Sequence, residues 1–105
     1  MSSLKTFSVI LSSMALYAAK LRVTGKVQDV SFRSFTKRNA DLLELRGFVK
    51  NVDDNHVEVI AEGNKDNIET LIEALRTGPE NAVVKKVDIE WQSYTGVHTD
   101  FKIIY

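Results

Sequence analysis

Apolar and polar residues alternate along much of this chain, with the period of two that a β-strand with one buried face requires. The alternation is cleanest over residues 56–62. Residues 83–91 also alternate, with Val83 and Val87 on the apolar face, but Lys85 shares that face and therefore indicates a strand at a sheet edge. The predicted strands are residues 17–24, 45–52, 56–62, 83–91 and 99–105.

Two other segments repeat apolar residues at helical spacing. One covers residues 32–44, and the other begins at Gly63 and Asn64 and stops at Gly78 and Pro79. The apolar and small positions are Phe32, Phe35, Thr36, Ala40 and Leu43 in the first segment and Ile68, Leu71, Ile72 and Leu75 in the second.

The order of these elements predicts an α+β fold of the ferredoxin-like α/β sandwich type. An antiparallel sheet would carry two helices on one face, in the order βαββαβ, followed by a short C-terminal strand. The first and third strands would lie in the middle of the sheet. We expect residues 17–105 to form this single domain, with residues 1–16 as a tail before it.

The tail contains an apolar run at residues 7–16, which serines interrupt and which is too short to span a membrane. The simplest interpretation is a loosely packed tail on a cytoplasmic protein. The alternative is that residues 1–15 are a secretory signal, in which case the protein is exported.

Composition narrows the function classes. Lysine plus arginine and aspartate plus glutamate are equal at 14 each, so no overall field favours nucleic acid or an acidic membrane. The absence of cysteine excludes disulfides and thiolate nucleophiles. His56 and His98 are far apart on polar stretches, and we interpret them as solvent-exposed residues instead of zinc ligands. We therefore expect no metal, no nucleic-acid partner and no membrane partner.

Arg33 and Asn51 are the best candidates for an anion site. In the predicted topology the first two strands end at the same edge of the sheet, which places Arg33, at the start of the first helix, near Asn51, at the end of the second strand. A loop that opens a helix offers free backbone N–H groups and the positive end of the helix dipole. A guanidinium can bind two phosphate oxygens. From residue types alone, a surface arginine and an ordinary strand end remain the simpler interpretation.

Two sequence motifs favour the anion site over that simpler interpretation. Residues 25–33, Gly-Lys-Val-Gln-Asp-Val-Ser-Phe-Arg, resemble the acylphosphatase signature, in which glycine and any residue precede Val-Gln-Gly-Val, any residue and Phe-Arg. Residues 47–51, Gly-Phe-Val-Lys-Asn, resemble the second motif of that family, which ends in asparagine. Shorter matches at residues 57–59, 61–63, 78–79 and 101–105 extend the resemblance over residues 18–105.

The resemblance implies hydrolysis of the carboxyl–phosphate bond of a small acyl phosphate, giving a carboxylate and inorganic phosphate. It implies no cofactor, no metal and no phosphoenzyme, and we expect a monomer. Arg33 would bind the phosphate, and Asn51 would orient the attacking water, whose proton a substrate phosphate oxygen can accept. The loop whose backbone amides would cradle the phosphate consists of Val27, Gln28, Asp29, Val30, Ser31 and Phe32.

Three positions depart from the family pattern. Asp29 replaces a loop glycine, which brings a negative charge to the phosphate site and predicts weaker substrate binding, unless its side chain turns to solvent or pairs with Arg33 or Lys26. A catalytically impaired phosphate-binding module is therefore the alternative function. Glu44 replaces the glycine that ends the first helix, at a cost of about 1 kcal/mol. Asn55 replaces a hairpin glycine without penalty.

Overall fold

The structure is a computed structural model that describes residues 15–105. Residues 1–14, and with them almost all of the predicted tail and of the alternative signal sequence, lie outside the described residues. Leu16, which we assigned to the tail, already belongs to the first strand. The first strand therefore begins one residue earlier than the hydrophobic pattern predicts.

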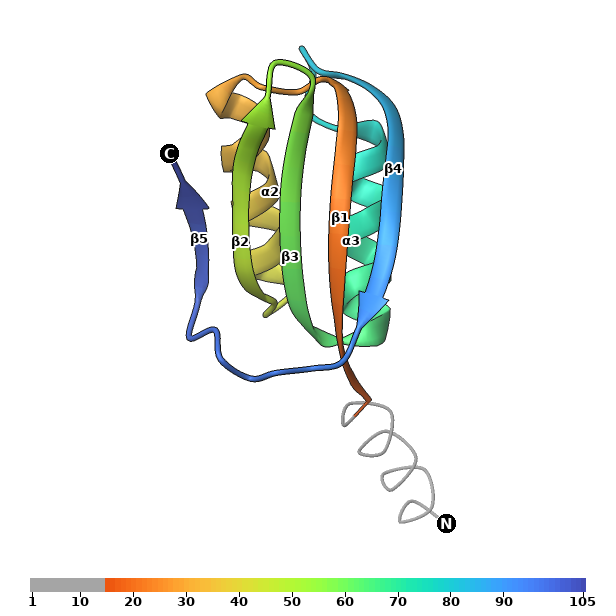
Figure 1. Cartoon of the computed structure of the whole chain (residues 1–105), viewed down its shortest axis with the longest axis vertical. Coiled ribbons are helices and arrows are strands. Elements are labelled where there is room, and N and C mark those ends of the chain that lie inside the picture. Colours follow the sequence, from red (N-terminus) through yellow and green to blue (C-terminus); the bar gives the residue numbers. More distant parts are fainter. Residues whose placement is uncertain (1–14) are drawn as a thin grey trace.

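The described chain forms five strands and two helices in the predicted order (Figure 1). They are β1 (Leu16–Lys26), α2 (Val30–Leu42), β2 (Arg46–Asp53), β3 (His56–Asn64), α3 (Lys65–Thr77), β4 (Val83–Gln92) and β5 (Phe101–Ile104). Within residues 15–105, no helix has both the length and the apolar character needed to cross a membrane.

The sheet has the order β4-β1-β3-β2-β5, so the predicted central position of the first and third strands is confirmed. Both helices lie against one face of the sheet (Figure 1). The sheet is mixed instead of wholly antiparallel, because β5 pairs with β2 in parallel. Residues 93–100 cross the lower end of the sheet in Figure 1 and carry the chain from β4 to β5. The expected ferredoxin-like α/β sandwich is otherwise confirmed.

The core lies between the sheet and the two helices, where the predicted apolar faces meet. Side chains from β1 and β3 pack against the apolar stripe of α3, because the strand period of two and the helix period of 3.6 each gather apolar residues on one side. The fully buried members of this contact include Leu21, Val23, Val57, Val59, Ile68, Leu71 and Leu75.

β4 does not alternate along its whole length. The β1–β4 register shifts between Thr24 and Gly25, so that Lys85 becomes an extra residue in β4. Val84 therefore turns toward the core while Val83 is 56% exposed, and the predicted placement of Val83 on the apolar face is wrong. A bulge inverts the alternation beyond it, and the sequence pattern does not reveal where the bulge falls. Gly25 permits the close approach of the strands, because a Cβ there would lie 2.1 Å from the Val83 carbonyl oxygen.

The first helix ends in a Schellman motif that places a glutamate in left-handed backbone conformation. Leu43 is the C-cap, and Glu44, at the C′ position, has a φ of 56°. The Glu44 amide donates to the Asp41 carbonyl oxygen at 3.1 Å, and the Leu45 amide donates to that of Ala40 at 2.9 Å. The predicted placement of Glu44 at the C′ position is confirmed. The helix begins and ends two residues before its predicted limits.

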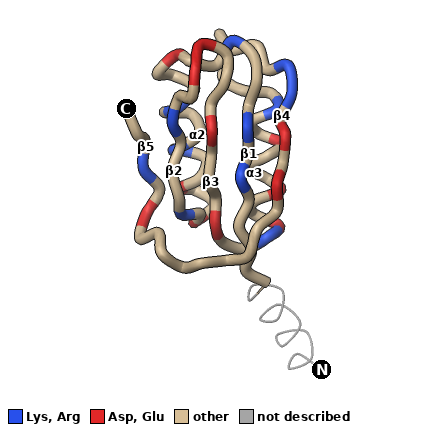
Figure 2. Tube along the Cα trace, viewed as in Figure 1, with Lys and Arg blue, Asp and Glu red and all other residues tan. Residues whose placement is uncertain are grey.

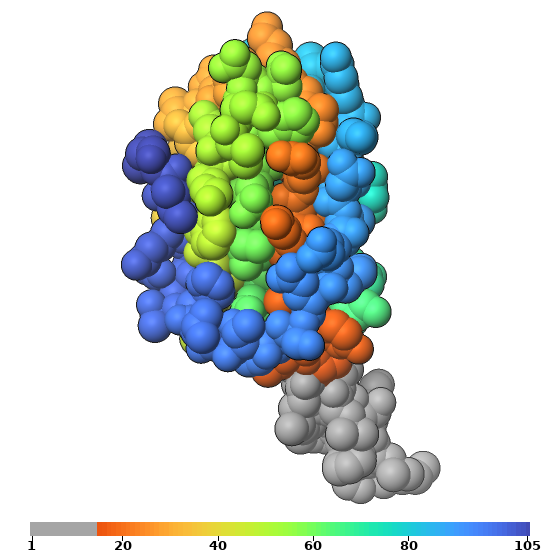
Figure 3. All heavy atoms as spheres, viewed as in Figure 1, coloured from red at the N-terminus to blue at the C-terminus, as the bar shows by residue number. Residues whose placement is uncertain are grey.

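Glu62 is buried on the face of the sheet opposite the helices. Its side chain is on the polar face of the predicted strand, yet the residue is only 3% exposed, because residues 93–100 cover that end of the sheet (Figure 3). The carboxylate accepts hydrogen bonds from the Thr95 hydroxyl at 2.7 Å, the Gly96 amide at 3.0 Å and the Thr95 amide at 3.2 Å. Burial raises its pKa, but these hydrogen bonds and the nearby His98 outweigh burial and hold the pKa below its ordinary value.

We predict that Glu44→Gly stabilises the protein by about 1 kcal/mol, because glycine adopts positive φ without the steric cost that a side chain carries. Urea unfolding monitored by circular dichroism measures the change. Glu44→Ala is the control, since it removes the charge but keeps a Cβ. Equal stabilisation by both variants would attribute the effect to charge and contradict the conformational explanation.

We predict that Glu62→Gln lowers the free energy of unfolding at neutral pH by about 1–3 kcal/mol, because an amide cannot accept all three hydrogen bonds as a carboxylate does. A depressed folded-state pKa contributes stability above the unfolded pKa and loses it as the pH falls through the folded pKa. The variant should therefore lose less stability than the wild type between about pH 5 and pH 3.

Chemical denaturation at a series of pH values tests this effect. The matched control is Glu58→Gln, which makes the same substitution on the same face of β3 but removes none of the hydrogen bonds to residues 95 and 96. An unchanged acid dependence in Glu62→Gln would refute the assigned role of Glu62.

Candidate active site

The loop between β1 and α2 is shaped by a helix cap. Asp29 is the N-cap of α2, with extended backbone dihedrals of φ −65° and ψ 144°. Its carboxylate oxygen Oδ1 accepts a hydrogen bond from the Ser31 amide at 2.9 Å, and its carbonyl oxygen accepts one from the Phe32 amide at 3.0 Å. The helix therefore begins at Val30, two residues earlier than its apolar spacing predicts, because an N-cap aspartate satisfies the first free amides.

Three consecutive backbone amides of this loop have no acceptor among residues 15–105. They belong to Gln28, Asp29 and Val30, at the N-terminal end of α2. The Val27 amide is different, because it donates to Oε1 of the Gln28 side chain at 3.2 Å. Free amides at the positive end of a helix dipole attract anions. The loop therefore offers three donors of the predicted phosphate cradle, while the Ser31 and Phe32 amides are engaged within the protein.

Arg33 is a buried cation with few partners. The residue is 9% exposed, and Nη1 donates to the Gln28 carbonyl oxygen at 3.2 Å. Its guanidinium carbon lies 5.6 Å from the centroid of the Tyr105 ring. Nε is buried and has no hydrogen-bond partner, and no carboxylate forms an ion pair with Arg33 among the described residues. Its charge is therefore enclosed by the fold and not balanced by any described acidic side chain.

Asn51 meets Arg33 at one backbone oxygen. Its side-chain Nδ2 donates to the Gln28 carbonyl oxygen at 3.1 Å, the same oxygen that accepts from Arg33. β1 and β2 each pair antiparallel with β3, so they run in the same direction and end at the same edge of the sheet. The expected proximity of Arg33 and Asn51 is confirmed, and its cause is the predicted topology.

The side chain of Asp29 adopts an arrangement that sequence reasoning missed. It forms no ion pair with Arg33 or Lys26 among residues 15–105. The residue is exposed, as in the expected alternative of a side chain turned to solvent, but its carboxylate also serves as the helix cap. Its φ is negative, so this backbone conformation does not require glycine. The available signal was an aspartate directly before a helical segment, a common N-cap pattern. The cap occupies the Ser31 amide, which a glycine at this position would leave for a bound anion.

The two histidines lie in separate surroundings. Nδ1 of His56 lies 2.6 Å from Oδ1 of Asp53 in the β2–β3 hairpin, whereas the His98 ring packs edge-on against Phe48, with centroids 6.1 Å apart. Both residues are half-buried, so they are less exposed than predicted. A backbone hydrogen bond from Asn55, followed by the contact with His56, holds the pKa of Asp53 below its ordinary value.

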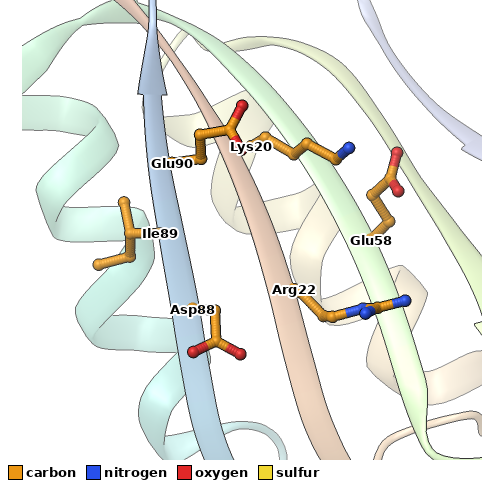
Figure 4. A pocket seen from close by; sticks show the side chains of 6 residues that line it. All are labelled: Lys20, Arg22, Glu58, Asp88, Ile89 and Glu90. Carbon is orange, nitrogen blue, oxygen red and sulfur yellow. The ribbon is translucent and has the colours of Figure 1, made fainter.

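The open face of the sheet has a different electrostatic character. A hollow of about 390 Å³ there is lined by Lys20 and Arg22 of β1 with Glu58, Asp88, Ile89 and Glu90 (Figure 4). Arg22 is paired in register with Glu58 on one side and Asp88 on the other. Basic residues of β1 thus stand beside acidic residues of β3 and β4 (Figure 2), so these cations have neighbours that compete with an anionic ligand. The β1–α2 loop provides the better anion site.

Comparisons with known proteins identify the family of this chain. The family model described as acylphosphatase matches residues 19–103. A curated acylphosphatase of Salinibacter ruber is 43% identical over 78% of this chain and 86% of its own length. One of Dehalococcoides mccartyi is 43% identical over 86% of this chain and its whole length.

A solved structure shows the same fold. The crystal structure of acylphosphatase from Bacillus subtilis superposes with a TM-score of 0.80 and 34% sequence identity. The match covers 85% of this chain and 99% of that one. The family match over residues 19–103 spans both motif segments, residues 25–33 and 47–51.

We predict that Asp29→Asn tightens the binding of inorganic phosphate about two- to fivefold, because the amide can still cap α2 while the negative charge is removed. Isothermal titration calorimetry at low salt measures the dissociation constant. Asp66→Asn is the matched control, since Asp66 lies in the first turn of the other helix. Similar changes in both variants would show that overall charge, and not the position of Asp29, determines the affinity.

Proposed function

The chain belongs to the acylphosphatase family and has acylphosphatase activity, and from this premise we propose that Arg33 binds the phosphoryl group while Asn51 positions the attacking water. The substrates are acyl phosphates, and the products are a carboxylate and inorganic phosphate. The proposal concerns how the residues of this chain carry out that hydrolysis.

The observation that carries the proposal is the buried guanidinium of Arg33. A charge removed from water without a partner is unfavourable by several kcal/mol, and a bound anion relieves that cost. Nε is buried without a partner, and no described carboxylate competes for the group. A planar guanidinium matches two phosphate oxygens at once, which the point charge of a lysine does not.

The loop amides supply the remaining phosphate contacts. The free N–H groups of Gln28, Asp29 and Val30 lie beside the carbonyl that Arg33 contacts, at the positive end of α2. Such donors stabilise the charge that builds up on the phosphoryl oxygens in the transition state. Because the fold sets their position beforehand, little reorganisation is needed during the reaction.

Asn51 is oriented for one role. Its Nδ2 is engaged by the Gln28 carbonyl oxygen, which leaves Oδ1 to accept a hydrogen bond from a water. The water oxygen then forms a bond to phosphorus, and the bond between phosphorus and the acyl oxygen breaks. The electron pair of that bond goes to the departing carboxylate, and the second hydrogen of the water passes to a phosphate oxygen. No side chain needs to act as general base in this mechanism, which relies on positioning and charge stabilisation.

We also propose that the enzyme is a monomer. The edge strand β4 has a bulge at Lys85 and carries Lys86, Asp88 and Glu90 on its exposed positions. Bulges and charges on an edge strand oppose pairing with a second copy of the chain.

We predict that Arg33→Ala and Asn51→Ala each lower kcat/KM for benzoyl phosphate by about 100-fold or more, as expected when a group that acts in the transition state is removed. Arg33→Ala should also weaken inhibition by inorganic phosphate at least about tenfold, because it removes a charged phosphate contact. Asn51→Ala should change the inhibition by phosphate little, because Asn51 contacts the attacking water and not the phosphate. Steady-state hydrolysis with phosphate as competitor measures both quantities.

Arg38→Ala is the matched control for this experiment, because Arg38 is an exposed arginine on the same helix and should leave the rate near that of the wild type. Arg33→Lys tests geometry, since it keeps the charge but not the fork of donors. Rates in Arg33→Ala and Asn51→Ala that equal the wild-type rate would disprove the assigned roles.

A further inference from the structure

A second feature of the loop region has no role in the chemistry described above. A hollow of about 240 Å³ lies between the start of α2 and the segment that joins α3 to β4. Its lining consists of Lys26, Gln28, Asp29, Ser31, Phe32, Asn81 and Ala82. Gln28 and Asp29 therefore belong both to this hollow and to the proposed phosphate loop.

The hollow and Asn51 lie on opposite flanks of that loop. In the sheet order β4-β1-β3-β2-β5, Ala82 comes directly before β4, on one side of β1, whereas Asn51 is on β2, on the other side of β1 and β3. Both features lie on the helix side of the sheet. Asn51 is opposite the buried Val57, so it shares the face that carries the helices, and the hollow reaches Phe32 of α2.

Phosphoryl transfer requires a particular arrangement of the two oxygens that exchange at phosphorus. The attacking and leaving oxygens lie roughly in line on opposite sides of the phosphorus atom. If the phosphoryl group rests on the loop amides with the water at Asn51, the acyl oxygen points to the opposite flank. We therefore propose that the hollow beside Asn81 receives the acyl group of the substrate. This inference rests on the proposed function, because it uses the positions of the phosphate and the water.

The lining indicates which acyl groups fit. The buried Phe32 and the half-buried Ala82 provide an apolar floor, while Ser31 and Asn81 form a polar rim. The volume is below the range of about 300–1,000 Å³ that is usual for sites of drug-sized ligands, so it suits one compact group such as an aromatic ring.

Charges at the rim refine the substrate class. Lys26 is the only cation that lines the hollow in the described part of the chain, and its ammonium group favours the carboxylate that forms when the bond to phosphorus breaks. Asp29 is the only anion there, and it disfavours a second carboxylate on the acyl group. The hollow therefore selects acyl phosphates with a compact, uncharged acyl group.

The test fills the hollow without altering the phosphate site. Asn81→Trp should lower kcat/KM for benzoyl phosphate about tenfold or more, because the indole then fills the space that the phenyl ring of the substrate occupies. The kcat/KM for acetyl phosphate should change less than about threefold, because its acyl group is smaller. The inhibition constant of inorganic phosphate should stay the same, since phosphate does not enter the hollow. Val97→Trp is the matched control, because Val97 is exposed and does not line the hollow, and it should preserve the wild-type preference between the two substrates.

Asn81→Leu repeats the measurement with a smaller side chain, and thermal unfolding of each variant confirms that it folds. A ratio of benzoyl to acetyl phosphate turnover that equals the wild-type ratio in both folded Asn81 variants would overturn the inference. Failure of the proposed function has a different signature, because Arg33→Ala would then hydrolyse both substrates as fast as the wild type does.

Discussion

The carbonyl oxygen of Gln28 holds the site of this protein together. It accepts one hydrogen bond from Arg33 of α2 and another from Asn51 of β2, so a loop, a helix and a strand meet at one atom. The oxygen carries a partial negative charge that directs the guanidinium toward the loop amides, and it also orients the amide of Asn51. A site that acts through position and charge needs this kind of support, because small displacements of a donor weaken transition-state stabilisation strongly.

The rest of the fold serves to bring these elements together. The pairing of β1 and β2 with β3 makes both strands end at one edge, and the packing of α2 against the sheet buries Arg33. Two glutamates in unusual surroundings, Glu44 and Glu62, lie away from the Arg33 and Asn51 site. Glu44 adopts a left-handed conformation at a helix end, and Glu62 is buried under residues 93–100. Both affect stability, whereas Asp29, as the cap of α2, affects the donors available to an anion.

Local pattern was sufficient for most of the architecture but not for its irregularities. The helical stripe at Ile68, Leu71, Ile72 and Leu75 and its cap predicted α3 well, because burial and capping act over a few neighbouring residues. The bulge at Lys85 depends on how two strands approach each other, so the alternation of β4 alone placed Val83 incorrectly. The burial of Glu62 depends on a segment more than 30 residues later in the chain and has no local signal.

The sequence by itself determined the order of strands and helices, the central place of β1 and β3, and the two motifs whose residues include Arg33 and Asn51. These follow from periodicity, from capping and from the order of residues, which are properties of the chain. Only the tertiary structure decided that both side chains share the carbonyl of Gln28, that Asp29 caps α2 instead of pairing with a cation, and that a hollow lies beside Asn81. The shared carbonyl and the hollow depend on the distance between segments that are remote in sequence, which packing sets and local pattern does not contain. The cap at Asp29 is a local contact, and the tertiary structure decided only that no described cation forms an ion pair with its carboxylate.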